Sequence, residues 1–362
     1  MNNRKTVIIA EAGVNHNGNL GMALELVDKA AQSGADYVKF QTFIGEELAS
    51  VNAKKAAYQA VNTDSTESQL GMLQRLELSQ DEHRIIMKRC DQNGVRFLST
   101  PFDLKSLSLL TKTFYLPEIK LGSGELTNAP LLLEAGRSGA KIILSTGMGS
   151  LAEVEEALGV LAFSMCRQGH PKSRADFSKV LLDPLVWRKL AERVTLLHCT
   201  TEYPAAVEDT NLRAMETMRQ AFGLKVGYSD HTRGLGVSIA AVALGACVLE
   251  KHFTLDRTLP GPDHSASLEP EELAELVHSV REVELALGTG IKQPGAAEVA
   301  NRQVARKSLL AKRELSAGHV LSLSDIAVKR PGNGMSPMEL WDVIGQPLAS
   351  SAYKDEAIDV KT

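Results

Sequence analysis

Short apolar runs alternate with amphipathic helical segments eight times over the first 290 residues of this 362-residue chain. The runs are nearly continuous in apolar residues, as is typical of strands buried on both faces. They are expected at residues 7–13, 37–43, 96–102, 119–125, 142–148, 194–200, 226–232 and 248–254. Strand–helix alternation of this length predicts a (β/α)8 TIM barrel, an α/β fold. A doubly wound open sheet is the alternative, but no G-x-G-x-x-G follows the first strand.

The helical segments carry their own end signals. Asn19 can cap the first helix and Gly34 ends it. Pro270 opens the helix after the last strand, and Gly288 follows that helix. The region 163–192 is longer than an ordinary connection, and we interpret it as an insertion.

The composition of the chain changes after residue 288. We expect residues 1–288 to form the barrel. Residues 289–302 are small, polar and Gly/Pro-bearing, which is typical of a linker. Residues 303–362 show short strand-like pieces with tight turns, and they predict a small domain with β character and little helix.

Charge and cysteine usage limit the classes of partner. The net charge of −4 gives no bias toward nucleic acid or an anionic membrane, so we expect neither as a partner. No apolar run approaches the roughly 18 residues that a membrane span needs, and no signal peptide is apparent. The four cysteines have no C-x-x-C spacing, which favours reduced thiols in a cytoplasmic protein.

Polar side chains gather where the predicted strands end, which is the edge that carries the active site in such barrels. They are Glu11, Lys39, Gln41, Ser99, Thr100, Lys120, Ser123, Glu125, Ser145, Thr146, His198, Thr200, Ser229, His231, Glu250 and His252, with Asn15 and His16 just beyond the first strand.

Two of these residues are histidines at matching depth on neighbouring strands. His231 and His252 can share one cation, and Glu11 would complete a partly open site for Mn, Fe, Co or Zn. Alternatively each imidazole forms hydrogen bonds within the barrel mouth. The occurrence of the two as a pair favours the metal.

Two lysines lie within otherwise apolar strands, where an unused charge is costly. Lys39 and Lys120, with nearby hydroxyls and the "GSGE" backbone, can hold a phosphate or carboxylate. Salt bridges of Lys39 with Glu11 and of Lys120 with Glu125 are the structural alternative. A lysine that forms a Schiff base, as in class I aldolases, is the competing catalytic interpretation.

Three further residues are candidates with less support from the sequence. Glu125 can act as a general acid/base or bind a hydroxyl group. Asp263, in the rigid "PGPDHSAS" loop, can bind a sugar hydroxyl or simply form a helix-entry turn. Arg330 precedes the tight turn of "KRPGNG", and an exposed arginine alone carries little weight.

Taken together in order, the motifs resemble the sialic acid synthase family, which comprises N-acetylneuraminate synthase and its legionaminate and pseudaminate relatives. The motifs are "IIAEAGVNHNGNL", "VKFQTF", "STPFD", "KLGSGELTNAPLL", "LSTGM", "LLHCTTEYPA", "GYSDHT", "LEKHFTLDR", "LPGPDH" and "VKRPGNG". The resemblance covers nearly the whole chain. It implies a TIM barrel joined to a small C-terminal antifreeze-like (SAF, β-clip) domain.

The resemblance also implies a reaction. Phosphoenolpyruvate would condense with an open-chain N-acetylated hexosamine, N-acetylmannosamine in our first interpretation, and with water, to give a nine-carbon acid and phosphate. The implied cofactor is a divalent metal, Mn²⁺ before Mg²⁺ or Co²⁺, and the implied assembly is a domain-exchanged homodimer.

The site residues carry over by matching motif positions. His231 and His252 match the metal ligands, and Glu125 and Glu11 match the catalytic carboxylates. The phosphoenolpyruvate site is matched by Lys39, Thr100, Lys120, Ser123, Ser145 and Ser229. The sugar site is matched by Gln41, Tyr203 and Asp263, and by Arg330 reaching in from the partner subunit.

Departures from the neuraminate pattern bear on the sugar. Thr201 stands where neuraminate synthases carry Asn, and Arg306 replaces an apolar residue. The segment "RKSLLA" leans toward the legionaminate type, so the alternative substrate is 2,4-diacetamido-2,4,6-trideoxymannose. A class I pyruvate aldolase and a non-catalytic sugar-binding or ice-binding protein are more remote alternatives.

Overall fold

The computed structural model describes residues 5–55 and 67–360. The chain divides into two compact units, Met1–Gly288 and Thr289–Thr362.

The first unit is built on eight parallel strands in the order β3-β2-β1-β8-β7-β6-β5-β4. They are β1 (Val7–Gly13), β2 (Tyr37–Thr42), β3 (Arg96–Pro101), β4 (Glu118–Leu121), β5 (Lys141–Ser145), β6 (Val194–Cys199), β7 (Lys225–Asp230) and β8 (Val248–His252). The two ends of this order, β3 and β4, lie next to each other without a ladder among the described residues. The predicted TIM barrel is therefore confirmed, as a nearly closed barrel.

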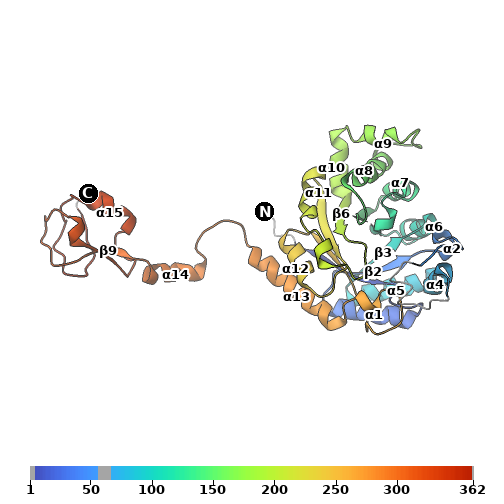
Figure 1. Cartoon of the computed structure of the whole chain (residues 1–362), viewed down its shortest axis with the longest axis horizontal. Coiled ribbons are helices and arrows are strands. Elements are labelled where there is room, and N and C mark those ends of the chain that lie inside the picture. The colour runs from blue at the N-terminus through green and yellow to red at the C-terminus, as the bar shows by residue number, and fades with distance from the viewer. Residues whose placement is uncertain (1–4, 56–66, 361–362) are drawn as a thin grey trace. The chain divides into compact units, whose positions relative to one another are not determined.

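Helices surround the strands on the outside of the barrel (Figure 1). They are α1 (Leu20–Gln32), α2 (Gly45–Leu48), α4 (Gln69–Leu76), α5 (Gln80–Asn93), α6 (Leu104–Ser108), α7 (Ala129–Arg137), α8 (Leu151–Cys166), α9 (Ala175–Val180), α10 (Pro184–Arg193), α11 (Ala214–Phe222), α12 (Gly236–Ala243) and α13 (Pro270–Leu287). Asn19 caps α1 by accepting a hydrogen bond from the Met22 amide, as the sequence predicts. The segment interpreted as an insertion contains the end of α8, all of α9 and most of α10, so three helices connect β5 to β6.

Alternate residues of each strand point into the barrel, because side chains of a strand alternate between its two faces. The lower inward layer is apolar and consists of Ile9, Tyr37, Leu98, Ile143, Leu197 and Val248. Two residues further along the same strands, the inward positions carry Glu11, Lys39, Thr100, Ser145, Cys199 and Glu250. The apolar layer thus forms the floor beneath a polar barrel mouth.

Most strands end earlier than the sequence indicates. The strand predicted at 119–125 ends at Leu121, and Ser123–Glu125 forms a 3-10 turn instead. The strand predicted at 226–232 ends at Asp230, so His231 lies one residue beyond β7. The polar residues that were assigned to strand ends therefore sit partly on the loops that follow.

The second unit contains one antiparallel strand pair, β9 (Ser308–Ala311) with β10 (Ile326–Lys329), and the short helix α15 (Leu340–Val343). Its own core includes Leu309, Ala311, Leu321 and Leu348. The segment predicted as a linker also differs from expectation. Residues Ala296–Ala305 form the helix α14, which begins with Glu298 bonded back to the Gly295 amide.

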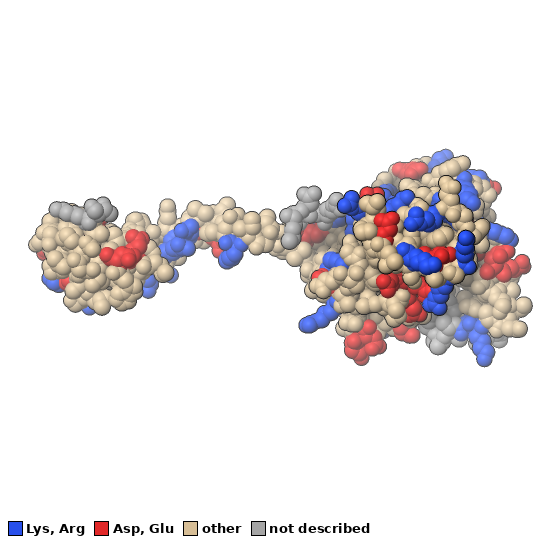
Figure 2. Space-filling view, turned by 90° about the horizontal axis from the view of Figure 1, so that it is seen from above, with Lys and Arg blue, Asp and Glu red and all other residues tan. Residues whose placement is uncertain are grey.

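Within the described ranges, no helix combines the length and the apolar character that crossing a membrane would require. On the face of the first unit that Figure 2 shows, basic and acidic side chains are mixed over the surface.

Candidate active site

A cavity of about 140 Å³ opens at the carboxyl ends of the strands. We call it the inner chamber. It is lined by Glu11, Lys39, Gln41, Thr100, Phe102, Lys120, Gly122, Ser123, Gly124, Ser145, Thr201, Tyr203, Ser229, His231, Glu250 and His252. All six residues that match a phosphoenolpyruvate site and both histidines therefore share one cavity.

The two lysines of the inner chamber are fully enclosed and held by carboxylates. Lys39 Nζ lies 2.6 Å from Glu11 Oε2 and 3.6 Å from Glu250 Oε2, and it donates to Thr100 Oγ1 at 3.1 Å. Lys120 Nζ lies 3.5 Å from Glu250 Oε1. The predicted alternative pairing of Lys39 with Glu11 is thus present.

The other predicted pairing, of Lys120 with Glu125, is wrong. Glu125 instead accepts a hydrogen bond from Asn128 Nδ2 at 2.6 Å. Lys120 finds its carboxylate on β8, because the closed order of strands turns the Glu250 side chain into the same inward layer.

Burial and charge set the protonation of these groups in opposite directions. Burial would lower the pKa of Lys39, but the carboxylates of Glu11 and Glu250 outweigh it and raise that pKa. Burial lowers the pKa of Lys120, which has only one carboxylate close by. Burial would raise the pKa of Glu250, but Lys120 and Lys39 bring it down to about 2. Glu250 is therefore the fixed negative charge between the two lysines.

Two further carboxyl groups of the chambers have raised pKa values. Burial raises the pKa of Glu11 despite the neighbouring Lys39. Burial also raises the pKa of Glu125, against the opposing hydrogen bond from Asn128. A carboxyl group with a raised pKa suits acid–base work near neutral pH.

The hydroxyl side of the chamber depends on a close backbone approach at Gly147. The Gly147 amide donates to Ser123 Oγ at 3.1 Å, and Cys199 Sγ lies 3.1 Å from the same oxygen. A Cβ at Gly147 would lie 2.2 Å from Thr201 Oγ1 and 2.8 Å from Ser123 Oγ. Only glycine fits here without displacing Ser123.

The imidazoles of His231 and His252 face the same space. Their ring centroids are 5.5 Å apart, and the Tyr203 ring lies 4.2 Å from the first and 5.3 Å from the second. His231 donates from Nδ1 to the Thr200 carbonyl at 2.6 Å, which leaves a lone pair on Nε2. Ser229 Oγ is 3.3 Å from that nitrogen and donates to Glu250 Oε1 at 2.9 Å.

These two residues fit a divalent metal. Burial lowers the pKa of His231 to about 4 and that of His252 well below its ordinary value, so both rings are neutral, as a ligand must be. His252 Nδ1 is buried and has no hydrogen-bond partner within the described part of the chain. A carbonyl that fixes the tautomer of a histidine, as Thr200 does, is the usual support of a metal ligand.

The described residues offer no group of three or more His, Cys, Asp or Glu side chains arranged to hold a metal. Two imidazoles alone would leave most coordination positions to substrate and water.

A second cavity of about 420 Å³ adjoins the inner chamber and shares Gln41, Phe102, Thr201, Tyr203 and His252 with it. We call it the outer chamber. Its remaining lining is mostly apolar: Val14, Leu48, Ala49, Ala53, Met72, Leu73, Leu76 and Pro262, with Ser50, Gln69, Glu125 and Asp263. Burial raises the pKa of Asp263 to about 6. The residues matched to sugar contacts in the first unit therefore lie in or beside this chamber.

Some predicted residues lie elsewhere. Arg330 belongs to the second unit, where its Nε donates to the Ala305 carbonyl at 2.9 Å. Asn15 supports loops, since it donates to the Phe253 carbonyl and to Ser267 Oγ. His16 accepts from the Gly18 amide and does not line either chamber.

Glu250 and Phe102 are among the chamber residues for which the sequence predicts no contact with a substrate or metal. Glu250 was noted only as a polar strand end, although the alternation of β8 places it two residues before His252 and on the same face. Phe102 follows β3 directly and lines both chambers, and nothing in its sequence context distinguishes it from a core residue.

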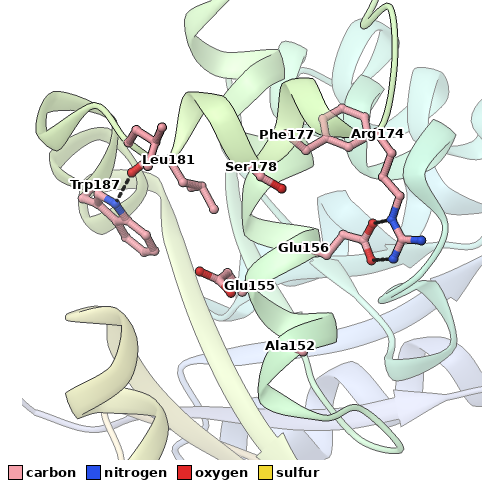
Figure 3. Close-up of a pocket in the computed structure, with 9 residues that line it drawn as sticks. Ala152, Glu155, Glu156, Arg174, Phe177, Ser178, Leu181 and Trp187 are labelled. Carbon is pink, nitrogen blue, oxygen red and sulfur yellow. Dashed lines mark hydrogen bonds and ion pairs between the residues drawn. The ribbon is translucent and has the colours of Figure 1, made fainter.

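A further cavity, of about 430 Å³, lies among the helices α8, α9 and α10 (Figure 3). Glu156 and Arg174 form a two-bonded ion pair on its wall, and Trp187 Nε1 donates to the Leu181 carbonyl at 2.9 Å. None of the predicted site residues lines this cavity, and its charged pair is already satisfied. The chemistry of the chain is concentrated in the barrel mouth.

Comparison with known proteins identifies the family. The model of the NeuB family matches residues 26–292, and the model of the SAF domain matches residues 306–359. The N,N'-diacetyllegionaminic acid synthase of Campylobacter jejuni is 47% identical over 98% of this chain and 99% of its own length. The enzyme of the same name from Legionella pneumophila is 42% identical over 94% of this chain and 90% of its own length. Human N-acetylneuraminate-9-phosphate synthase is 33% identical over 97% of this chain and 90% of its own length.

A solved structure agrees with these sequences. The N-acetylneuraminic acid synthetase of Leptospira borgpetersenii superposes with a TM-score of 0.65 at 32% identity, covering 83% of this chain and 90% of that one. The expected SAF domain is confirmed, and so is the family that the motifs indicate. This chain therefore belongs to the NeuB family, as an enzyme that carries a SAF domain at its C-terminal end.

Proposed function

We propose that the chain condenses phosphoenolpyruvate with 2,4-diacetamido-2,4,6-trideoxymannose and water to give N,N'-diacetyllegionaminate and phosphate. The observation that carries this proposal is the pairing of two chambers, one built for an anion and one largely apolar. The relatives with the highest identities quoted above are named for this product, which favours it over our first interpretation, the neuraminate reaction with N-acetylmannosamine.

The inner chamber suits phosphoenolpyruvate. Lys39 and Lys120 supply two ammonium groups, and Thr100, Ser123, Ser145 and Ser229 supply hydroxyls around the same space. Protonation of Glu11 would leave the lysines with Glu250 as the one compensating charge, so an arriving anion meets a net positive site. The phosphate and carboxylate of one small molecule can then both be held.

The outer chamber suits a sugar with few hydroxyl groups. The leucines Leu48, Leu73 and Leu76 and Met72 would pack against a deoxygenated carbon and the methyl group of an acetamide. Asp263 and Gln41 would bind the polar groups of the open-chain sugar. A further sugar hydroxyl placed against these leucines and Met72 would find no hydrogen-bond partner in their side chains, which costs affinity.

The residues would act in sequence on the two substrates. A divalent metal held by His231 and His252 would supply Lewis-acid polarisation of the sugar aldehyde, with Mn²⁺ the first candidate before Mg²⁺ or Co²⁺. Lys39 and Lys120 would orient the enol so that its carbon 3 forms the new bond to the aldehyde carbon.

Two carboxyl groups would then manage the protons. Carbon 2 becomes cationic as the bond forms, and water adds there with loss of a proton. Glu125 and Glu11, whose pKa values are raised, would take that proton and return one to the new alkoxide. The hydroxyl group that water has added to carbon 2 then gives its proton to the departing phosphate as the bond between carbon 2 and the phosphate oxygen breaks. This forms the ketone and leaves the phosphate beside Lys39 and Lys120. No Schiff base is needed.

The assembly that fits this function is a domain-exchanged homodimer in which Arg330 of one subunit completes the sugar site of the other. This part of the proposal rests on the resemblance of "KRPGNG" to the family motif. The four cysteines are unpaired, which suits a reducing cytoplasm.

Phosphate release with phosphoenolpyruvate and a panel of N-acetylated hexosamines tests the reaction. We expect release with the diacetamido sugar that stops with EDTA and returns with Mn²⁺, and a product mass equal to both substrates plus water minus phosphoric acid. Covalent labelling by borohydride in the presence of pyruvate would instead support the class I aldolase. If the protein released no phosphate with any of these sugars, the result would support the alternative of a non-catalytic sugar-binding or ice-binding protein.

A further inference from the structure

One ion pair interrupts the apolar layer between the barrel and its helices. Val226, Tyr228 and Leu249 are outward residues of β7 and β8 and belong to this apolar layer. The last outward residue of each strand is charged: Asp230 on β7 and Lys251 on β8. Both residues of this pair are 1% exposed, and Lys251 Nζ lies 2.9 Å from Asp230 Oδ2.

The pair is the centre of a hydrogen-bond network. Asp230 Oδ1 accepts from the amide and from the hydroxyl of Thr232, each at 2.8 Å. Asp230 Oδ2 accepts from Ser238 Oγ of α12 at 2.5 Å. Lys251 also donates to the Thr232 carbonyl at 2.5 Å. Thr232 is thus held at three of its polar groups.

This network surrounds His231 and adjoins His252. Asp230 and Lys251 are register partners across the β7–β8 ladder, and each directly precedes one of the two histidines. His231 itself lies between Asp230 and Thr232, and its carbonyl accepts from the Ala205 amide at 2.9 Å. The ion pair therefore fixes both backbones at the point where the two imidazoles turn into the barrel.

Stability alone is a weak reason for such a pair. Replacing a buried ion pair by apolar residues of similar volume is often neutral or stabilising, because both charges lose their hydration on burial. The neighbouring layer is apolar and would accept such residues. The ion pair can instead be explained by a need to fix the separation of the His231 and His252 side chains, which apolar packing would not do.

We propose that Asp230 and Lys251 are positioning residues that set the spacing of His231 and His252 for one metal ion. The inference rests on the metal site of the proposed function. It adds a requirement, namely that the outward ion pair controls metal affinity without touching the metal.

Mn²⁺ binding to the full-length protein, followed by titration calorimetry and by the loss of the free-ion electron paramagnetic resonance signal, tests this role. Lys251→Met and Asp230→Asn should weaken Mn²⁺ binding by about 10- to 100-fold, the usual effect of losing the support of a ligand. The double variant Asp230→Leu with Lys251→Met should regain resistance to urea but not Mn²⁺ affinity. If the ion pair served stability alone, the double variant would regain Mn²⁺ affinity together with urea resistance, or neither property would change in the variants.

Two further variants serve as controls. Thr232→Val keeps the side-chain volume and removes one bond to Asp230, so a smaller loss of Mn²⁺ affinity is expected even if Lys251→Met does not fold. Arg281→Met removes a partly buried ion pair with Asp36 far from the chambers and should leave Mn²⁺ affinity unchanged.

The outcomes separate the two proposals. Wild-type affinity in both Lys251→Met and Thr232→Val would overturn the positioning role while the metal site stands. Failure of the wild-type protein to bind Mn²⁺ would overturn the metal site itself, and the positioning role with it.

Discussion

At the residue scale, Lys120 has the least compensated charge in the inner chamber. Lys39 has two carboxylates within 3.6 Å, whereas Lys120 has one, at 3.5 Å. With a single close carboxylate and a pKa lowered by burial, the ammonium form of Lys120 would be stabilised more than that of Lys39 by an arriving substrate anion. Lys120 should therefore contribute more to anion binding than to holding the fold.

Lys120→Met should lower kcat/KM for phosphoenolpyruvate by at least about 100-fold, because a charge aimed at the phosphate in a water-poor site is lost. Steady-state phosphate release measures this effect. Lys105→Met, on an exposed side chain paired with Glu47, is the matched control and should leave kcat/KM unchanged. Equal, small effects of the two substitutions would contradict the role of Lys120.

At the element scale, α2 and α4 present the apolar wall of the outer chamber. Leu48 ends α2 and Leu73 lies in α4, and both are partly buried beside Met72. Such a wall selects against a sugar whose hydroxyl groups would be buried on it without hydrogen-bond partners, and it adds little specific binding of its own.

Leu73→Asn should lower kcat/KM for the diacetamido sugar by about 10-fold and leave KM for phosphoenolpyruvate near its original value. Kinetics with each substrate varied in turn give both numbers. Leu285→Asn, on α13 where the leucine is 79% exposed, is the control. If KM for phosphoenolpyruvate changed as much as that for the sugar, the division into two chambers would be wrong.

The second unit depends on one carboxylate. Asp325 accepts from Arg313, from His319, and from the amide and hydroxyl of Ser322. Hydrogen bonds from His319 and Ser322 are the main reason that its pKa lies well below the ordinary 3.8. A lowered carboxyl pKa contributes stability above the unfolded-state pKa, and this contribution is lost as pH falls through the folded-state pKa.

Asp325→Asn should therefore lower the free energy of unfolding of this unit by about 2 kcal/mol at pH 7 and by less at pH 3. Urea unfolding followed by Trp341 fluorescence in a Trp187→Phe background reports on this unit. Asp355→Asn, which breaks an exposed pair with Lys329, should lower the free energy of unfolding by less than Asp325→Asn does. A pH-independent effect of Asp325→Asn would contradict the electrostatic cause.

At the scale of the whole molecule, the proposed exchange of Arg330 between subunits can be tested by mixing two inactive variants. Co-assembled Glu125→Gln and Arg330→Ala chains form heterodimers in which one site has both intact residues, if Arg330 acts on the partner. About a quarter of wild-type activity should then return, since half of the dimers are mixed and each has one whole site. Arg330 acting within its own chain would restore nothing.

The sequence predicts the scaffold well because the barrel is specified locally. Each strand is an apolar run of its own, and inward alternation then places Lys39, Ser229 and Glu250 in one layer without any knowledge of the structure. The strand ends were less accurate, since a ladder stops where its neighbour stops and not at a residue type. This explains the early end of β4 at Leu121.

Contacts between distant strands were beyond local patterns. Lys120 was expected to pair with Glu125, five residues away, but its partner Glu250 comes from the strand that closes the barrel order. The helix α14 was missed because Gly and Pro around residues 290–295 outweighed the helix-forming sequence that follows them. The apolar outer chamber likewise draws on segments that are not adjacent in sequence.

The most direct test of the whole account compares two sugars in one assay. The ratio of kcat/KM for 2,4-diacetamido-2,4,6-trideoxymannose to that for N-acetylmannosamine, measured by phosphate release with saturating phosphoenolpyruvate and Mn²⁺, should exceed about 10 because of the apolar wall. A ratio of one or less would contradict the substrate that the two chambers indicate.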